Sequence, residues 1–144
     1  MSITPVSSPL RAAFAISRGS KSVAETIVVE LIEDMHRGRG ECVPYARYDE
    51  SAASVIAQIE DLRTALEGGR SREDLQDLLP AGAARCAVDC ALWDLHAKQT
   101  GEPVWTLAGL TEPKPLPTTM TISLDTADRM AEASAECAPE PMSA

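Results

Sequence analysis

The sequence predicts an α+β fold in which three strands form an antiparallel meander and three helices follow. Residues 1–45 are rich in β-branched residues and turn signals, which is typical of strands joined by short connections. After Asp49 apolar residues recur every three or four positions, the period of an amphipathic helix. We therefore predict a domain over 1–111, a stiff Pro-rich linker over 112–117 and the start of a second, β-then-α region over 118–144.

The three strands are expected at residues 3–16, 26–34 and 41–45. Two prolines in the first segment suit an edge strand, and the second segment has five β-branched residues, at 26–29 and 32. The polar segments between them, 17–25 and 36–40, are expected to be a loop and a turn. Because these connections are short, the strands should pair antiparallel.

The helices are expected from Ser51 to the glycines at 68–69, over 71–79, and over 83–100. Gly101 supplies the C-cap of the third helix. That helix carries a stripe of mostly small apolar residues, which lets another element approach closely: Ala84, Ala87, Val88, Ala91, Leu92 and Leu95. Beyond the linker, a strand is expected at 118–124 and a helix at 126–138.

Composition excludes several classes of function. The net charge of −9 and the dispersed basic residues argue against a nucleic-acid partner. No apolar run approaches the ~20 residues that span a bilayer, and the N-terminus lacks a signal-peptide layout, so a cytoplasmic protein is expected. The four cysteines form no C-x-x-C pair and are expected to be packing residues. Asp89, Asp94 and His96 are interpreted as structural or surface residues and not as a metal cluster.

Four segments, in this order, resemble the enolase superfamily in its mandelate racemase/muconate lactonizing enzyme branch. They are SPLRAAFAISRGSKSVAETIVVEL (8–31), GRGECVPYARYDES (38–51), AVDCALWDLHAKQTGEPVWTLAGL (87–110) and TTMTISLD (118–125). The second is similar to the family's G-x-G-E-x-x-P-Y turn, and the third to its A-L-W-D-L-x-x-K-x-x-G-x-P run. The fourth resembles the first barrel strand of dipeptide (L-Ala-D/L-Glu) epimerases.

The resemblance implies an N-terminal capping domain followed by the first βα unit of a truncated TIM-type barrel. In full-length relatives a lysine removes the proton α to a substrate carboxylate, Mg²⁺ stabilises the enediolate, and a second lysine returns the proton. The expected substrate is a small dipeptide or another carboxylate, and full-length relatives are expected to be homo-oligomers.

Carried over by position, two loops of the cap that cover the substrate correspond to about 15–25 and 42–50. Arg18 then matches an arginine that binds the side-chain carboxylate of an acidic dipeptide, which suits a bidentate guanidinium. Thr121 and Tyr48 are the other candidate substrate-binding residues. Each has a structural alternative: a solvated arginine, a packing threonine, or a tyrosine that supports a proline turn.

No residue of this chain matches the family's catalytic lysines or its acidic metal ligands, so no catalytic residue and no metal ligand is expected here. The family's Lys-x-Lys strand would begin near residue 144, and the chain is expected to be an inactive fragment with a poorly ordered region after Gly109. Two alternatives stay open. One is another superfamily reaction (muconate cycloisomerase, o-succinylbenzoate synthase or N-acylamino-acid racemase). The other is a non-catalytic module that docks onto a separate barrel subunit.

Overall fold

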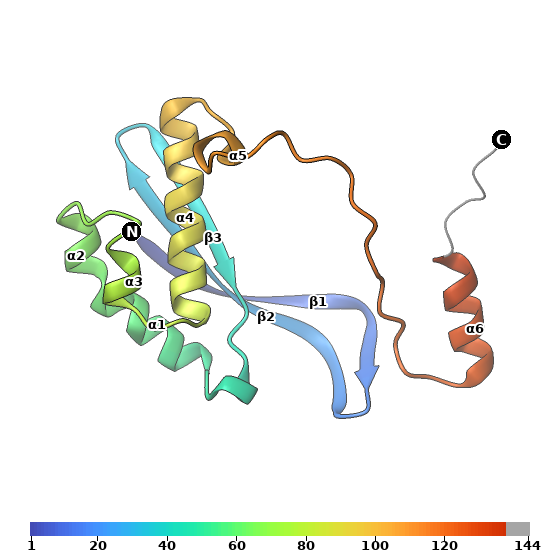
Figure 1. Cartoon of the computed structure of the whole chain (residues 1–144). Helices are drawn as coiled ribbons and strands as arrows, with labels where there is room; N and C mark the ends of the chain where they lie inside the picture. Colours follow the sequence, from blue (N-terminus) through green and yellow to red (C-terminus); the bar gives the residue numbers. More distant parts are fainter. Residues whose placement is uncertain (138–144) are drawn as a thin grey trace. The chain divides into compact units, whose positions relative to one another are not determined.

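The computed structural model describes residues 1–137 of the chain, and it opens with three strands (Figure 1). These are β1 (Ser2–Ile16), β2 (Gly19–Glu33) and β3 (His36–Cys42), which form one sheet in the order β1-β2-β3. Helices follow the strands in the chain, so the predicted α+β class, an antiparallel three-stranded sheet followed by helices, is confirmed.

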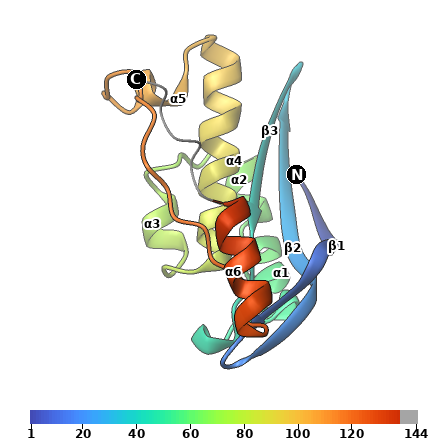
Figure 2. The same cartoon turned by 90° about the vertical axis from the view of Figure 1, so that its right-hand side faces the viewer.

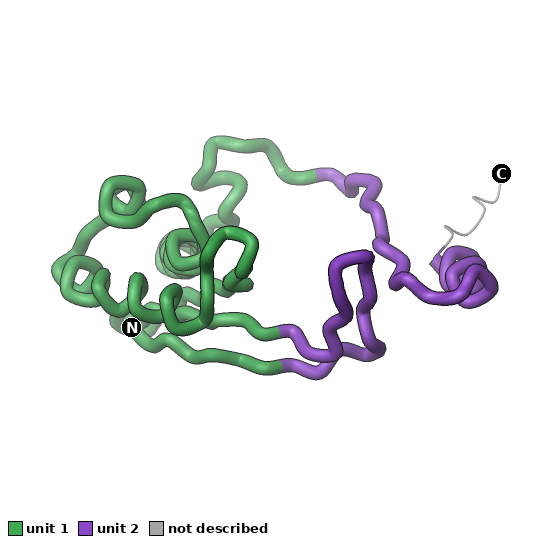
Figure 3. The backbone as a smooth tube through the Cα atoms, turned by 90° about the horizontal axis from the view of Figure 1, so that it is seen from below, with its two compact units in different colours: residues 1–7, 25–113 green, residues 8–24, 114–144 purple. Residues whose placement is uncertain are grey.

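The chain divides into two compact units (Figure 3). The first contains residues 1–7 and 25–113, and the second contains residues 8–24 and 114–144. The boundaries fall inside β1 and β2, because the outer part of this hairpin belongs to the second unit.

The strands differ from the prediction at both connections. The segment 17–25, expected as a loop, is a two-residue turn at Ser17–Arg18 followed by the start of β2, with Gly19 at φ +147°. The segment 36–40, expected as a turn, lies within β3, and the turn is at Asp34 and Met35. The pairing runs from Ile27 opposite Cys42 to Glu33 opposite His36. Polar residues and glycines are part of these strands because the partner strand forms hydrogen bonds with their backbone groups. This pairing outweighs the low strand propensity of their side chains.

The first unit contains five α-helices: α1 (Ala52–Asp61), α2 (Arg63–Glu67), α3 (Leu75–Leu78), α4 (Ala83–Thr100) and α5 (Val104–Leu107). The helices α1 to α4 lie on one side of the sheet (Figure 2). The single helix predicted from Ser51 is divided at Leu62, whose N–H turns back to the carbonyl of Ile59 at 3.2 Å. This tighter turn buries the Leu62 side chain in the core. It also lets Arg63 donate to the carbonyl of Met1 at 2.7 Å.

The core lies between α4, α1 and the sheet. Alternate residues of β2, Ile27, Val29 and Leu31, face it, and Val55 and Ile59 of α1 are fully buried there. The predicted stripe of α4 forms the other wall; all its members are buried except Leu92, which is partly buried. Gly101 ends α4 at φ +74°, as the sequence predicts.

Helix α4 lies unusually close to β3. A Cβ added at Gly40 would come within 2.6 Å of the backbone nitrogen of Ala91, and one at Gly38 within 2.7 Å of that of Leu95. Both distances are too short for any residue larger than glycine. The small residues on both sides, Ala87 and Ala91 on the helix and two glycines on the strand, therefore set this close packing.

In the second unit the strand predicted at 118–124 is not formed in the described residues. This segment is extended, and within the described residues one backbone–backbone hydrogen bond joins it to β1, from the N–H of Leu124 to the carbonyl of Ala15 at 2.9 Å. The Ser123 hydroxyl adds two side-chain bonds, accepting the N–H of Ala15 at 2.9 Å and donating to the carbonyl of Ala13 at 3.3 Å. A barrel strand needs a neighbour along its length to satisfy its backbone groups, and one backbone–backbone bond does not supply that. The helix predicted at 126–138 is present as α6 (Ala127–Glu136). Residue 138, its predicted end, and the rest of the predicted region up to 144 lie outside the described residues.

Candidate functional site

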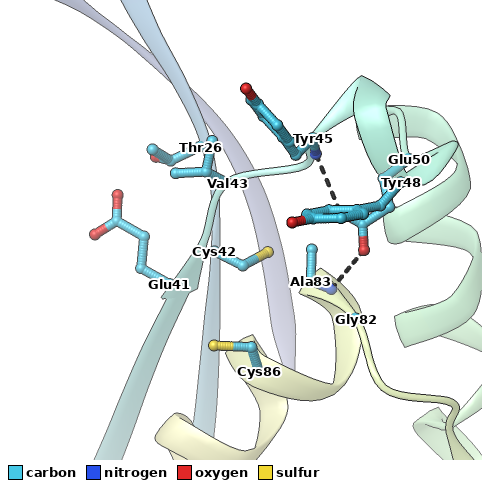
Figure 4. A pocket seen from close by; sticks show the side chains of 10 residues that line it. All are labelled: Thr26, Glu41, Cys42, Val43, Tyr45, Tyr48, Glu50, Gly82, Ala83 and Cys86. Carbon is cyan, nitrogen blue, oxygen red and sulfur yellow. Dashed lines mark hydrogen bonds between the residues drawn. The ribbon is translucent and has the colours of Figure 1, made fainter.

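A hollow of about 560 Å³ opens where β3 ends, in the first unit (Figure 4). Its walls come from the end of β3, the segment that follows it, and the start of α4. The residues that define its chemistry are Glu41, Cys42, Tyr45, Tyr48, Glu50 and Cys86. The hollow therefore combines two aromatic rings, two carboxylates and two thiols.

The segment after β3 follows the proline at 44 into a short 3-10 helix, η1 (Ala46–Tyr48). The N–H of Tyr48 bonds to the carbonyl of Tyr45 at 2.8 Å, and the rings of these tyrosines lie 5.7 Å apart at an angle of 53°. Asp49 then takes a left-handed conformation, φ +58°, which ends the turn. This local geometry leaves the Tyr48 side chain 72% exposed at the rim of the hollow.

Glu50 connects this turn to the N-terminus of α4. One carboxylate oxygen accepts the N–H of Ala83 at 2.7 Å, and the other accepts the N–H of Tyr45 at 3.0 Å. The sequence interpretation included Glu50 in the loop 42–50 but did not single it out. No local pattern could have done so, because its partner Ala83 is 33 positions away.

The two thiols at the hollow differ in exposure: Cys42 is buried and Cys86 is exposed. Burial, with the nearby Cys86 and Glu50, raises the pKa of the Cys42 thiol to about 11. Burial also raises the pKa of Cys90, one turn further along α4, with Cys86 adding to the effect. At neutral pH the Cys42 and Cys90 side chains are therefore neutral thiols, which are poor nucleophiles and poor metal ligands.

The three candidate substrate-binding residues fall in different places. Arg18 is exposed at the turn between β1 and β2, in the second unit. Thr121 is also exposed in the second unit, on the extended segment and not on the predicted strand. Tyr48 is at the hollow in the first unit. No hydrogen bond joins any two of these three within residues 1–137, so their role in binding stays a prediction.

The acidic residues of α4 have structural partners. Asp94 accepts the N–H of Arg39 at 2.7 Å and pairs with Lys98 at 2.6 Å, and Asp89 lies 3.7 Å from the guanidinium of Arg72. His96 is exposed. Across the described residues, no three His, Cys, Asp or Glu side chains come together as a metal site would require.

None of the helices described in residues 1–137 combines the length and the apolar character needed to cross a membrane. The geometry of the hollow provides a binding surface: aromatic rings, a carboxylate that already accepts two backbone bonds, and the buried neutral thiol of Cys42. It provides no arrangement of acid, base and nucleophile for chemistry.

Two curated relatives show what this chain is similar to. It is 51% identical over 123 residues to an L-Ala-D/L-Glu epimerase of Escherichia coli, which covers 85% of this chain and 38% of the relative. It is 43% identical over 109 residues to an N-acetyl-D-glutamate racemase of a Pseudoalteromonas species, covering 74% of this chain and 34% of that protein. The chain thus spans about two fifths or less of the length of these relatives.

Solved structures agree. An enolase family member from Agrobacterium tumefaciens with homology to dipeptide epimerases, with bound sodium and L-Ala-L-Glu, superposes with a TM-score of 0.88 at 40% identity. The match covers 94% of this chain and 41% of that one. A dipeptide epimerase from Cytophaga hutchinsonii, complexed with Mg and D-Ala-L-Val, gives 0.78 at 25% identity and covers 93% and 39%.

The sequence profile of the mandelate racemase/muconate lactonizing enzyme N-terminal domain matches residues 1–109. This range contains the whole sheet and helices α1 to α5, and it includes every residue that lines the hollow. The chain therefore belongs to the mandelate racemase/muconate lactonizing enzyme family, and it carries the family's N-terminal domain.

Proposed function

We propose that this chain is the capping domain and first βα unit of a dipeptide epimerase that acts on acidic dipeptides, and that it is inactive alone. The observation that carries the proposal is the 51% identity over 123 residues with the E. coli epimerase of L-Ala-D/L-Glu. The task of this part of the protein is to bind and cover the substrate. We place the domain boundary at the Pro-rich residues 112–117.

The substrate class is supported by what two relatives act on. L-Ala-D/L-Glu and N-acetyl-D-glutamate, named for the E. coli and Pseudoalteromonas proteins, share a glutamate residue with a side-chain carboxylate. In the described residues the guanidinium of Arg18 is exposed and has no hydrogen bond or ion pair. We propose that it takes that carboxylate as a bidentate partner. Thr121 and Tyr48 are proposed to contact other parts of the substrate.

Mg²⁺ is proposed for the full-length enzyme, as in the Cytophaga structure. When bound, it would stabilise negative charge on a substrate carboxylate during proton removal. The side chains of residues 1–137 do not fit a metal, since no three ligands come together there. We therefore assign no step through the metal to this chain and none of the proton transfers.

A chimera tests the proposal. Residues 1–137 of this chain are joined to the remaining sequence of the E. coli epimerase, and loss of the α-proton of the glutamate residue in L-Ala-L-Glu is followed by NMR in D₂O with Mg²⁺. The chimera should exchange this proton, and the 144-residue chain alone should not. Exchange by the purified 144-residue chain, or a folded chimera with no exchange, would contradict the proposal.

One alternative reaction has an observation in its favour. The 43% identity with the Pseudoalteromonas racemase supports an N-acylamino-acid racemase. The same chimera is assayed with N-acetylglutamate and with L-Ala-L-Glu, and its ratio of kcat/KM values is compared with the ratio for the E. coli epimerase itself. A shift of the ratio toward N-acetylglutamate would favour the racemase. Muconate cycloisomerase, o-succinylbenzoate synthase and a docking module for a separate barrel remain alternatives without such support. For the full-length protein we propose a cytoplasmic homo-oligomer without a nucleic-acid partner.

A further inference from the structure

The Glu50 side chain joins the turn that carries Tyr48 to the N-terminus of α4. One carboxylate oxygen accepts from Tyr45 N–H and the other from Ala83 N–H (Figure 4). The two bonds leave opposite ends of one planar group. They therefore fix the position of the turn relative to the helix.

The α4 end of this connection is the first residue of the helix, Ala83. The N-cap residue Gly82 makes no side-chain capping bond, so the Glu50 carboxylate satisfies a helical N–H that would otherwise lack a cap. Its negative charge also lies at the positive end of an 18-residue helix. A Cβ added at Gly82 would be 2.8 Å from the Glu50 carboxylate, which shows how closely this carboxylate lies against the N-cap backbone. Ala83 itself is buried against the core.

The other end of the connection reaches Tyr48 through the backbone. Tyr45 is the N-cap of η1, and its carbonyl accepts the N–H of Tyr48 at 2.8 Å. The Glu50 bond to Tyr45 therefore restrains the turn that sets the Tyr48 ring. A 72% exposed tyrosine on such a short turn has few packing contacts of its own to hold it.

We propose that Glu50 is a positioning residue: by joining the Tyr45 N–H to the N-terminus of α4, it holds the Tyr48 ring in place for the substrate. The substrate part rests on the proposed function, in which Tyr48 contacts the dipeptide. Glu50 touches no reacting atom in this scheme. It acts through the backbone of the turn.

The test uses the full 144-residue chain labelled with ¹⁵N, and the variants Glu50→Gln, Glu50→Ala and Ser54→Ala. In Glu50→Gln the side chain keeps its size, but its NH₂ cannot accept a hydrogen bond, so one of the two bonds is lost. In Glu50→Ala both are lost. Ser54→Ala is the matched control, because it removes the capping box that Ser51 and Ser54 form on α1 without touching Tyr45.

Hydrogen exchange at Tyr45 and Ala83 should be roughly tenfold faster in Glu50→Ala, the size expected for one lost hydrogen bond, and faster at one of the two in Glu50→Gln. The nuclear Overhauser contacts between the Tyr45 and Tyr48 rings should weaken in both. Ser54→Ala should leave these three readouts at wild-type values. Unchanged ring contacts in Glu50→Gln and in folded Glu50→Ala would overturn the positioning role.

Titration with L-Ala-L-Glu separates this inference from the proposed function. If the dipeptide changes the NMR chemical shifts of the Tyr48 ring in the wild type but not in Glu50→Gln, the result supports both the substrate role of Tyr48 and the positioning role of Glu50. If the wild type shows no shift at Tyr48, the substrate role of Tyr48 fails and with it the purpose proposed for Glu50. The exchange and ring-contact data still show whether Glu50 orders the turn.

Discussion

Asp94 accepts the backbone N–H of Arg39 at 2.7 Å, so a side chain of α4 satisfies a group on the outer edge of β3. Lys98, one turn later, donates to the carbonyl of Arg37 at 2.8 Å and to Asp94 at 2.6 Å. Since β3 is at the edge of the sheet, these groups have no strand beyond them in the described part of the chain. The Asp94–Lys98 pair takes the place of a neighbouring strand and reduces the risk of edge-to-edge association. It can reach the edge because the glycines of β3 let α4 lie so close.

Replacing Asp94 should lower the free energy of unfolding, by an amount that depends on pH. Burial alone would raise the pKa of Asp94, but the hydrogen bonds from Lys98 and Arg39 outweigh it and hold the pKa below its ordinary value. The unfolded chain therefore binds this proton more readily. The stabilisation is present above about pH 4 and is lost as the pH falls through the folded-state pKa. Asp94→Asn should lower the free energy of unfolding by about 1 kcal/mol at neutral pH, since the side chain is 35% exposed.

Urea unfolding of Asp94→Asn and the wild type at a series of pH values measures this difference. The difference in the free energy of unfolding between the two proteins should become smaller below about pH 4, because the wild-type carboxylate is then protonated. Asp77→Asn, a change at an exposed aspartate on α3, is the control and should leave the profile unchanged. A gap between Asp94→Asn and wild type that stays constant down to about pH 2 would contradict the assignment.

Replacing Gly40 by alanine should be strongly destabilising. The added methyl group would lie within 2.6 Å of the backbone nitrogen of Ala91, so β3 and α4 must separate. We expect a loss of about 2–3 kcal/mol in the free energy of unfolding, the upper part of the range for overpacked cores. Gly68→Ala is the control, because its Cβ would meet the carbonyl oxygens of Thr64 at 3.1 Å and Ala65 at 3.4 Å and no backbone atom closer than these. Equal losses in the two variants, by urea unfolding, would show that α4 and β3 are not in this close contact.

The cysteines should react with iodoacetamide in the order of their exposure. At about pH 8 the exposed Cys86 and Cys137 should be alkylated first, and Cys42 more than about tenfold slower, because it is buried and its pKa is raised to about 11. Peptide mass spectrometry over time measures the rates. In denaturant all four should react at similar rates. A Cys42 that reacts as fast as Cys86 in the native chain would mean that the Cys42 thiol is open to reagent and not buried.

Arg18→Ala in the E. coli chimera should raise KM for L-Ala-L-Glu by roughly ten- to a hundredfold, since a charge-assisted bidentate pair is lost. The effect on kcat should be small, because Arg18 is proposed to bind the substrate side chain and not the reacting carbon. A dipeptide without a side-chain carboxylate, L-Ala-L-Ala, is the control substrate, and its KM should not change. An equal rise in KM for both dipeptides would indicate a structural role for the turn between β1 and β2.

The order of the elements follows from local patterns in the chain. The strands have β-branched residues, α1 and α4 have the helical period, and Gly101 and Thr126 mark the helix ends at which α4 stops and α6 begins. Burial of the α4 stripe could be predicted because it depends mainly on the chemistry of each residue and its spacing. The same holds for the motifs that carry the family resemblance.

The contacts that shape the site join residues far apart in the chain. Glu50 meets Ala83, Asp94 meets Arg39, and polar residues at 19–25 and 36–40 become strand because a partner strand satisfies their backbone. The segment 118–124 shows the reverse case: its apolar, β-branched residues predict a strand, but a single backbone–backbone hydrogen bond, to Ala15, does not supply a strand's partner. Local periodicity measures how a segment would be buried, whereas backbone hydrogen bonds and capping carboxylates depend on which groups the fold brings together. That is the physical reason why these features appear only once the chain is folded.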